Sequence, residues 1–255
     1  MKLAIMQPYF MPYIGYFQAI SAVDKYILYS NLNFIKEAWM NRNRLLLKDG
    51  MVYQFTVPLL HKSSNQMIRE VRIDNSKPWA KNLLLTIASN YNKAPFFAES
   101  FPLVEELLNQ RYDFLYELNA SCIRAVADHL GIETEIECDN SRFLDMEEDL
   151  STIDTLGYER FPYMEKTSPI RKTARVIEMC RREGAQTFIN AIGGQALYDK
   201  VEFAEYGIDL RFVKTDEISY PQHHGFQESN LSIMDVLMFN GKEGTCELLK
   251  KYTLV

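Results

Sequence analysis

The stretch KLAIMQPYFMPYIGYFQ, residues 2–18, decides the fold of this chain. It begins with a short apolar strand, residues 2–6, and continues into a turn that contains Pro8, Pro12 and Gly15. Proline fixes φ and glycine allows close backbone approach, so this turn is rigid without being regular. Open α/β sheets bind ligands where a strand ends and the next helix begins. The stretch therefore predicts an α/β fold with a ligand site directly after its first strand.

This turn also carries side chains that can form hydrogen bonds. They are Gln7, Tyr9, Tyr13, Tyr16 and Gln18. We predict that Gln7, Tyr9, Tyr13 and Tyr16 bind substrate. The alternative is that the rings fill the core, which is what we expect of Phe10 and Phe17 because phenylalanine is usually buried.

The composition is that of a folded globular protein. The 255 residues are 47% hydrophobic and 13% aromatic, enough for one large domain or a domain with an elaboration. The net charge of −6 argues against general nucleic-acid binding, which needs an excess of clustered Lys and Arg, although a local basic cluster can still bind phosphate.

No targeting or membrane signal is apparent in the sequence. No apolar run approaches the roughly 20 residues of a bilayer span, and the N-terminus lacks the features of a signal peptide. We therefore expect a soluble, cytoplasmic protein without a membrane span. The four cysteines form no CxxC pair and no HExxH motif occurs, so we expect neither disulfides nor a metal site.

The first half of the chain predicts a parallel βαβ opening, a hairpin and a helical insertion. The opening consists of strands 2–6 and 25–29 around a helix at 13–22. The Asp49-Gly50 pair predicts a hairpin, and a third antiparallel strand is expected nearby. The remaining expected elements are hairpin strands 44–47 and 52–57, a strand at 67–73, helices at 79–91, 101–110 and 114–130 ending at Gly131, and a strand at 133–138.

The second half predicts another α/β portion after a long polar segment. Residues 140–168 are expected to form a lid or mobile loop. Structureless runs of this length are uncommon in compact domains unless they are functional or disordered. The expected elements that follow are helix 168–183, strand 186–190, a Gly193-Gly194 turn, helix 195–206, strand 209–213 and helices 232–239 and 242–252. The turn at 191–195 is a second candidate ligand loop, with a purely structural turn as the alternative.

Together these patterns predict an α/β protein with a mixed sheet, a parallel βαβ opening, a helical insertion at about residues 78–131 and a second α/β portion. We expect an N-terminal region, 1–140, and a C-terminal region, 141–255, packed as one compact unit.

A basic cluster precedes the predicted hairpin. Asn41, Arg42, Asn43 and Arg44 offer two guanidinium groups and two amides, which suit bidentate binding of phosphate or carboxylate. On a strand, Arg42 and Arg44 point to the same face, and Trp39 lies close in sequence. We predict that Trp39, Asn41, Arg42 and Arg44 bind a nucleotide diphosphate. The alternative is a solvated patch paired with acidic side chains.

The candidate general base is one of two adjacent histidines. His223 and His224 lie in a polar loop, and imidazole has an unperturbed pKa of ~6.5, near that of a base for acyl transfer to an amine. Asp235 is a candidate orienting carboxylate. The alternatives are a loop with two solvated histidines and an aspartate that stabilises the start of a helix.

Several motifs resemble the WbqC-like family, over residues 2 to about 245. They are QPYFMPYIGYFQ at 7–18, WMNRNR at 39–44, TVPL at 56–59, YPQ at 220–222, LSIMD at 231–235 and FNG at 239–241. The closing motifs add Gln222 to the substrate-binding candidates. The chain differs from the family pattern at Asn31 and around residues 190–195.

The resemblance implies a role in bacterial surface-glycan biosynthesis, such as that of lipopolysaccharide O-antigen or capsule. Members of the family look like enzymes that N-acylate or aminoacylate a nucleotide-linked amino sugar. Our first hypothesis is therefore such a transferase, with a coenzyme A or acyl carrier protein thioester as co-substrate, no tightly bound cofactor, and the subunit number left open.

Two further hypotheses stay open. One is a nucleotidyltransferase or adenylating enzyme, because the strand leading into a Pro/Gly turn is similar to the HIGH-type fold, although this turn lacks the histidine. The other is a non-catalytic binding protein of a glycan pathway, which would act through its aromatic surface.

Overall fold

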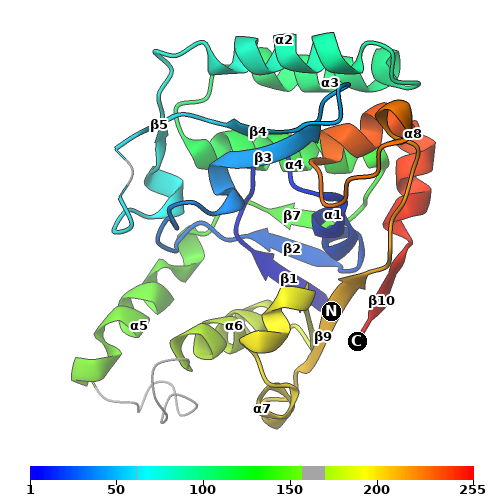
Figure 1. The fold of residues 1–255 in the computed structure, drawn as a ribbon. Helices are drawn as coiled ribbons and strands as arrows, with labels where there is room; N and C mark the ends of the chain where they lie inside the picture. Colours follow the sequence, from blue (N-terminus) through cyan, green and yellow to red (C-terminus); the bar gives the residue numbers. More distant parts are fainter. Residues whose placement is uncertain (62, 157–169) are drawn as a thin grey trace.

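The computed structural model describes residues 1–61, 63–156 and 170–255. Its centre is a six-stranded sheet in the order β10-β9-β8-β1-β2-β7 (Figure 1). The strands are β1 (Lys2–Met6), β2 (Lys25–Leu28), β7 (Glu135–Glu137), β8 (Thr187–Ala191), β9 (Asp209–Thr215) and β10 (Tyr252–Leu254). All neighbours pair in parallel except β10, which is antiparallel to β9. The predicted α/β class and mixed sheet with a parallel opening are confirmed.

Helices cover both faces of this sheet, as the alternation of side chains along β1 requires. Ala4 packs into the core on the side of α1 (Ile14–Ser21), α4 (Leu115–Leu130) and α8 (Ile233–Leu249). Leu3 packs into a second core with α5 (Leu144–Leu156), α6 (Ile170–Glu183) and α7 (Lys200–Glu205). Figure 1 shows these two layers above and below the sheet.

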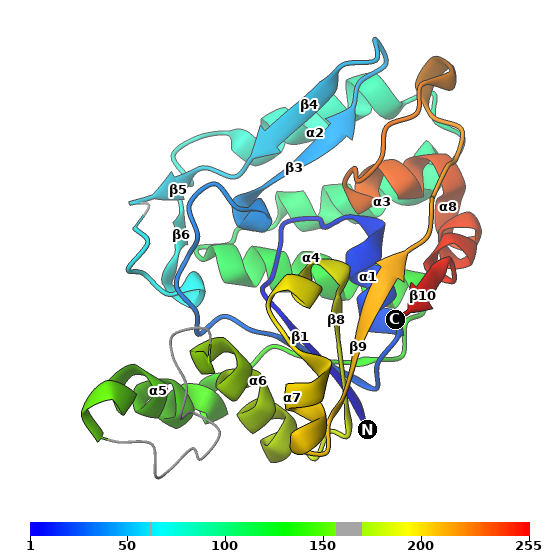
Figure 2. The same cartoon turned by 60° about the horizontal axis from the view of Figure 1, so that its bottom comes forward.

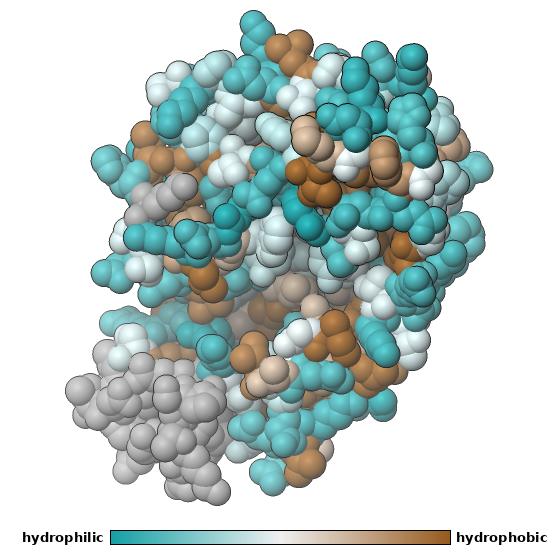
Figure 3. Space-filling view, viewed as in Figure 1, coloured by the Kyte–Doolittle hydropathy of each residue, from teal (hydrophilic) through white to brown (hydrophobic). Residues whose placement is uncertain are grey.

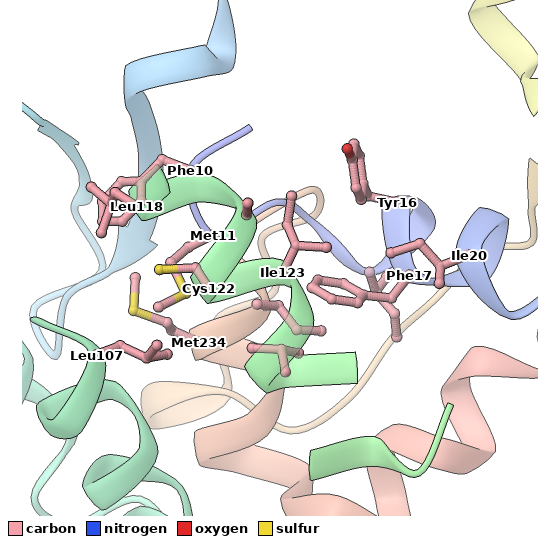
Figure 4. Close-up of a cluster of buried hydrophobic side chains, with 14 of the residues drawn as sticks. Phe10, Met11, Tyr16, Phe17, Ile20, Leu107, Leu118, Cys122, Ile123 and Met234 are labelled. Carbon is pink, nitrogen blue, oxygen red and sulfur yellow. The ribbon is translucent and has the colours of Figure 1, made fainter. Parts of the chain in front are cut away.

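The first core also fixes the turn after β1. Phe10, Met11 and Phe17 are fully buried there, and Figure 4 shows them with Cys122 and Met234, from α4 and α8. Phe10 and Phe17 are therefore core residues, as predicted.

Two hairpins and two helices form a further layer, next to α4 and α8 (Figures 1 and 2). The hairpins are β3 (Arg42–Leu46) with β4 (Val52–Thr56), and β5 (Leu59–Leu60) with β6 (Arg72–Ile73). The helices are α2 (Trp79–Tyr91) and α3 (Phe97–Asn109). This layer contributes the basic cluster, because β3 begins at Arg42.

The order of the strands reverses at β1, so the topological switch point of the sheet lies at the carboxyl ends of β1 and β8. The chain passes from β1 to β2 on one side, whereas β8 and β9 lie on the other. Doubly wound sheets bind ligands at such a switch point. Figure 3 shows a hollow in the middle of this face, where the carboxyl ends of β1 and β2 lie in Figure 1.

Several predicted elements differ from the structure. The predicted strand at 67–73 is a 3-10 turn, Ile68–Glu70, followed by the two-residue strand β6. Residues 144–156 of the predicted lid are helix α5, and the rest of that segment, 157–169, lies outside the described residues. After β8 the chain forms a 3-10 turn, Ile192–Ala196, so α7 begins only at Lys200. Strand β10 was not predicted.

The two predicted C-terminal helices form one kinked helix, α8. The kink lies at Gly241, with φ 63° and ψ −171°, a conformation that only glycine adopts without strain. A Cβ atom at this position would lie 2.4 Å from the ring of Phe96. Gly241, which lies between the predicted helices 232–239 and 242–252, is therefore the residue at which α8 bends.

Candidate functional site

A cavity of about 390 Å³ lies between the turn after β1, strand β3 and the chain that precedes α8. We call it the aromatic pocket and define it by its lining residues, which are Tyr9, Pro12, Tyr13, Trp39, Asn43, Arg44 and Asn230. Four of the predicted substrate-binding residues thus lie together: Tyr9, Tyr13, Trp39 and Arg44.

The wall formed by the turn is held by side chains from two other elements. Asn43 Nδ2 donates hydrogen bonds to the carbonyls of Phe10 (3.1 Å) and Met11 (2.6 Å). Ser232 Oγ donates to the same Met11 carbonyl at 2.9 Å. The backbone amide of Ile233 donates to Pro12 O at 2.9 Å. Because β3 and α8 satisfy these carbonyls, the turn is held in one conformation.

Arg44 is the cationic side chain that lines the pocket. Its guanidinium carbon lies 5.6 Å from the centre of the Trp39 ring, and that of Arg42 lies 5.9 Å away, so both arginines share a face as predicted. Arg44 Nη2 makes long hydrogen bonds to the carbonyls of Ser229 (3.4 Å) and Asn230 (3.3 Å).

The remaining contacts leave Arg44 with unused donors. Its Nη1 lies 3.9 Å from Oε1 of Glu228, and its Nε is buried without a hydrogen-bond partner among the described residues. A guanidinium has five N–H donors, and because Nε is closed off from solvent, the Nη1 donors are the ones that can still bind an anion.

The N-terminus of α1 adds positive potential beside the pocket. Tyr13 is the N-cap residue, its side chain makes no capping hydrogen bond, and the first turn carries no acidic residue. A Cβ atom at Gly15 would lie 2.4 Å from the ring of Tyr13 and 2.7 Å from Thr215 Oγ1, so glycine lets this ring sit against the helix. Burial raises the pKa of both Tyr9 and Tyr13, which keeps their hydroxyl groups protonated and able to donate.

Other predicted binding residues hold the backbone and do not line the pocket. Tyr16 is buried and its hydroxyl donates to the carbonyl of Gln7 at 2.9 Å. Asn41 Nδ2 donates to Val57 O at 2.8 Å. Arg42 Nε donates to Ala38 O at 3.2 Å.

Asp235 lies in the core and is not among the residues that line the pocket. It is fully buried and accepts hydrogen bonds from the hydroxyls of Tyr91 (2.6 Å) and Tyr220 (2.7 Å) and from Gln222 Nε2 (3.2 Å). Burial raises its pKa, and these three hydrogen bonds act in the opposite direction.

The two histidines occupy different environments. The ring of His223 packs between Tyr91 (4.9 Å between centres) and Phe239 (4.8 Å), and burial lowers its pKa. His224 is exposed, with a positive φ of 50°. Neither ring is among the pocket-lining residues, and the hydrogen bonds of Asp235 come from other side chains. The catalytic roles of His223, His224 and Asp235 stay predictions.

Sequence reasoning missed Asn230 and did not select Asn43 as a site residue. Asn43 belongs to the basic motif at 39–44. Because side chains alternate along β3, Asn43 points away from Arg42 and Arg44, and its amide holds the turn after β1. Asn230 has a positive φ of 55° and lies two residues before Ser232, the N-cap of α8. An asparagine just before the start of a helix could have predicted the positive φ of Asn230, but it could not have predicted the contact with β3.

In residues 1–61, 63–156 and 170–255 no group of three or more His, Cys, Asp or Glu side chains is arranged to hold a metal ion. The four cysteines are free thiols. Within the same ranges, no helix is both long and apolar enough to cross a bilayer.

The profile of the WbqC-like protein family matches residues 7–247, from the first residue of the turn to the last part of α8. The chain belongs to the WbqC-like protein family. This WbqC-like protein is also 29% identical over 245 residues to the uncharacterized protein Rv1507c of Mycobacterium tuberculosis, covering 95% of each chain. No solved structure matches it. The family is thereby established, and no activity comes with it.

Proposed function

We propose that this WbqC-like protein is an N-acyl- or aminoacyltransferase that acts on a nucleotide-linked amino sugar in surface-glycan biosynthesis. The aromatic pocket would bind the nucleotide diphosphate part of that substrate. The observation that carries the proposal is Arg44, whose guanidinium lies over the Trp39 ring and keeps Nη1 donors for an anion, in a pocket at the N-terminus of α1.

The chemistry of the pocket suits this ligand. A diphosphate offers oxygens to the donors of Arg44 and to the positive end of α1. Its base and sugar offer faces and hydroxyls to the rings and hydroxyl groups of Tyr9 and Tyr13. The cavity, at about 390 Å³, is large enough for part of a nucleotide sugar, with the remainder extending into solvent.

The proposed reaction transfers an acyl group from a thioester to the sugar amine. The amine nitrogen attacks the thioester carbonyl, the C–N bond forms, and the C–S bond breaks with release of a thiolate. The proton lost by the nitrogen passes to a base. We assign this role to His224, because its imidazole is exposed whereas that of His223 is buried.

Binding of UDP- and dTDP-linked amino sugars tests the ligand. We expect the melting temperature of the wild type to rise with one of these sugar nucleotides. We expect Arg44→Gln to weaken binding by roughly tenfold or more, because the variant loses one or two hydrogen bonds from a charged donor. Arg111→Gln is the matched control, because Arg111 is exposed and paired with Asp113 at 3.6 Å. Equal affinity of wild type and Arg44→Gln would contradict the assignment.

Turnover tests the base. With a sugar nucleotide and a coenzyme A thioester, we expect His224→Asn to lower kcat while leaving the affinity for the sugar nucleotide unchanged. Asparagine is chosen because it tolerates the positive φ of this position. Unchanged kcat would remove His224 from the mechanism.

The strand order favours one second candidate, a nucleotidyltransferase or adenylating enzyme. A sheet that reverses at β1 is the arrangement of doubly wound nucleotide-binding folds. Release of pyrophosphate from ATP in the presence of an acid would support this candidate. Acyl transfer from a preformed thioester without ATP would rule it out.

A further inference from the structure

The chain from Gln222 to Asn230 forms a strap that ends on the aromatic pocket. Its shape depends on one side chain: Gln222 Nε2 donates to Glu228 O at 2.9 Å, and the Glu228 amide donates to Gln222 Oε1 at 2.7 Å. The amide of Gln222 thus closes the strap into a loop, much as a pair of backbone hydrogen bonds closes a hairpin. Figure 2 shows this loop in orange, reaching the end of the β3–β4 hairpin.

The closed strap is anchored to the core by Asp235. The same Gln222 Nε2 lies 3.2 Å from Asp235 Oδ1, which also accepts from Tyr220, the residue two positions before the strap begins. The other carboxylate oxygen accepts from Tyr91 on α2, whose hydroxyl in turn accepts from the amide of Leu46 on β3 at 3.1 Å. One carboxylate therefore connects α8, α2, β3 and the strap.

This arrangement would be costly as packing alone. Asp235 is fully buried, and a carboxyl group in the core often contributes no more stability than an apolar side chain of the same size. Here those bonds fix the position of a loop that has few backbone hydrogen bonds of its own.

The other end of the strap lies on Arg44. The carbonyls of Ser229 and Asn230 accept from Arg44 Nη2, and the amide of Ser232 donates to Arg44 O at 3.0 Å. Asn230 also lines the pocket. A displacement of the strap would therefore change both the wall of the pocket and the orientation of the guanidinium.

We propose that Asp235 and Gln222 are positioning residues for the aromatic pocket: they hold the strap so that Asn230 and its neighbouring carbonyls orient Arg44 for an anionic ligand. Asp235 acts in this way through Gln222, which is one of its three hydrogen-bond donors together with Tyr91 and Tyr220. As regards the identity of the ligand, this inference rests on the proposed function.

The test uses Gln222→Leu and Asp235→Asn in the full chain without ligand. The matched control is Thr245→Val, because Thr245 is also fully buried on α8 and its hydroxyl has no hydrogen-bond partner among the described residues. We expect hydrogen exchange of the Glu228 amide to accelerate about tenfold or more in both variants and to stay unchanged in the control. Urea unfolding of each variant separates this local effect from a loss of global stability.

A second measurement follows the pocket itself. In a Trp79→Phe background, Trp39 is the sole tryptophan, and iodide is an anion that quenches its fluorescence. We expect iodide quenching of Trp39 to change in both variants and not in Thr245→Val. If Asp235→Asn does not fold, Tyr220→Phe replaces it, since this variant removes one hydrogen bond from the same carboxylate.

The outcomes separate this inference from the proposed function. Unaltered exchange at Glu228, or altered exchange with unaltered Trp39 quenching, would overturn the positioning role. UDP serves as the ligand probe, and we expect the two variants to bind it about tenfold more weakly than wild type, whereas Thr245→Val binds as wild type does. Wild type that fails to bind UDP, while exchange and quenching change as expected, would refute the nucleotide ligand and leave the positioning role supported.

Discussion

Single buried polar side chains hold the loops around the aromatic pocket. Asn43, Ser232 and Gln222 are all buried, and each donates to backbone carbonyls near the aromatic pocket. Buried polar groups are retained where their hydrogen bonds are satisfied, so these three fix loops that apolar side chains could not hold. Polar residues in the motifs around the pocket therefore serve to hold its loops, and Asn43 both lines the pocket and holds the turn.

His223 leads to a prediction about pH. Burial lowers its pKa, so between its folded pKa and the unfolded value of about 6.5 the unfolded chain binds more protons. The contribution of His223 to the free energy of unfolding is then fully present above about pH 6.5 and is lost as the pH falls below it. We expect His223→Leu to flatten the decline in stability between pH 7 and pH 5, as measured by urea unfolding. The exposed His61, replaced by asparagine, is the control, and an identical slope in wild type and His223→Leu would contradict the prediction.

At the scale of elements, the periodicity of the sequence predicted the helices and strands that form locally. Helix α2 has the predicted bounds, and Gly131 ends α4 with a φ of 70°. Helix α5 was missed because its polar segment predicted a loop, whereas the strands that were missed depend on pairing with other segments. Strands β5 and β6 have two residues each and form only because they pair with each other, and β10 forms because β9 offers it an edge.

The candidate site shows the same division. Tyr9, Tyr13, Trp39 and Arg44 could be predicted because they lie in two aromatic and basic motifs. Asn230 could not, because its contact with Arg44 joins positions 186 residues apart. No periodic pattern records such a contact, and only the folded chain brings the two together.

The kink in α8 depends on the glycine at position 241. Gly241→Ala would place a methyl group in the ring of Phe96 and strain the backbone, so we expect a loss of stability of roughly 2–4 kcal/mol in urea unfolding. Gly193→Ala is the control, because no atom lies within 4 Å of the added methyl group, and we expect a change of at most about 1 kcal/mol. Equal losses in the two variants would show that the kink is not specified by this glycine.

At the scale of the whole molecule, the sheet joins the two halves of the chain. Strand β1 pairs with β8 through Leu3 and Phe188, and Gln18 donates to the carbonyls of Leu248 and Lys251. Lys25 on β2 lies 3.1 Å from Glu183 at the end of α6. Each half thus buries its central strand edge against the other, and each half alone would expose an unpaired apolar edge.

Cooperative unfolding is therefore expected for the full chain. Both tryptophans, Trp39 and Trp79, lie in the first half, whereas far-UV circular dichroism reports the helices of both halves. If the halves depend on each other across β1 and β8, tryptophan fluorescence and circular dichroism will give coincident urea transitions. A fluorescence transition at a different midpoint would mean that residues 1–140 unfold as a separate domain. In that case the aromatic pocket, which combines Arg44 of the first half with the strap of the second half, would be lost at the lower of the two midpoints.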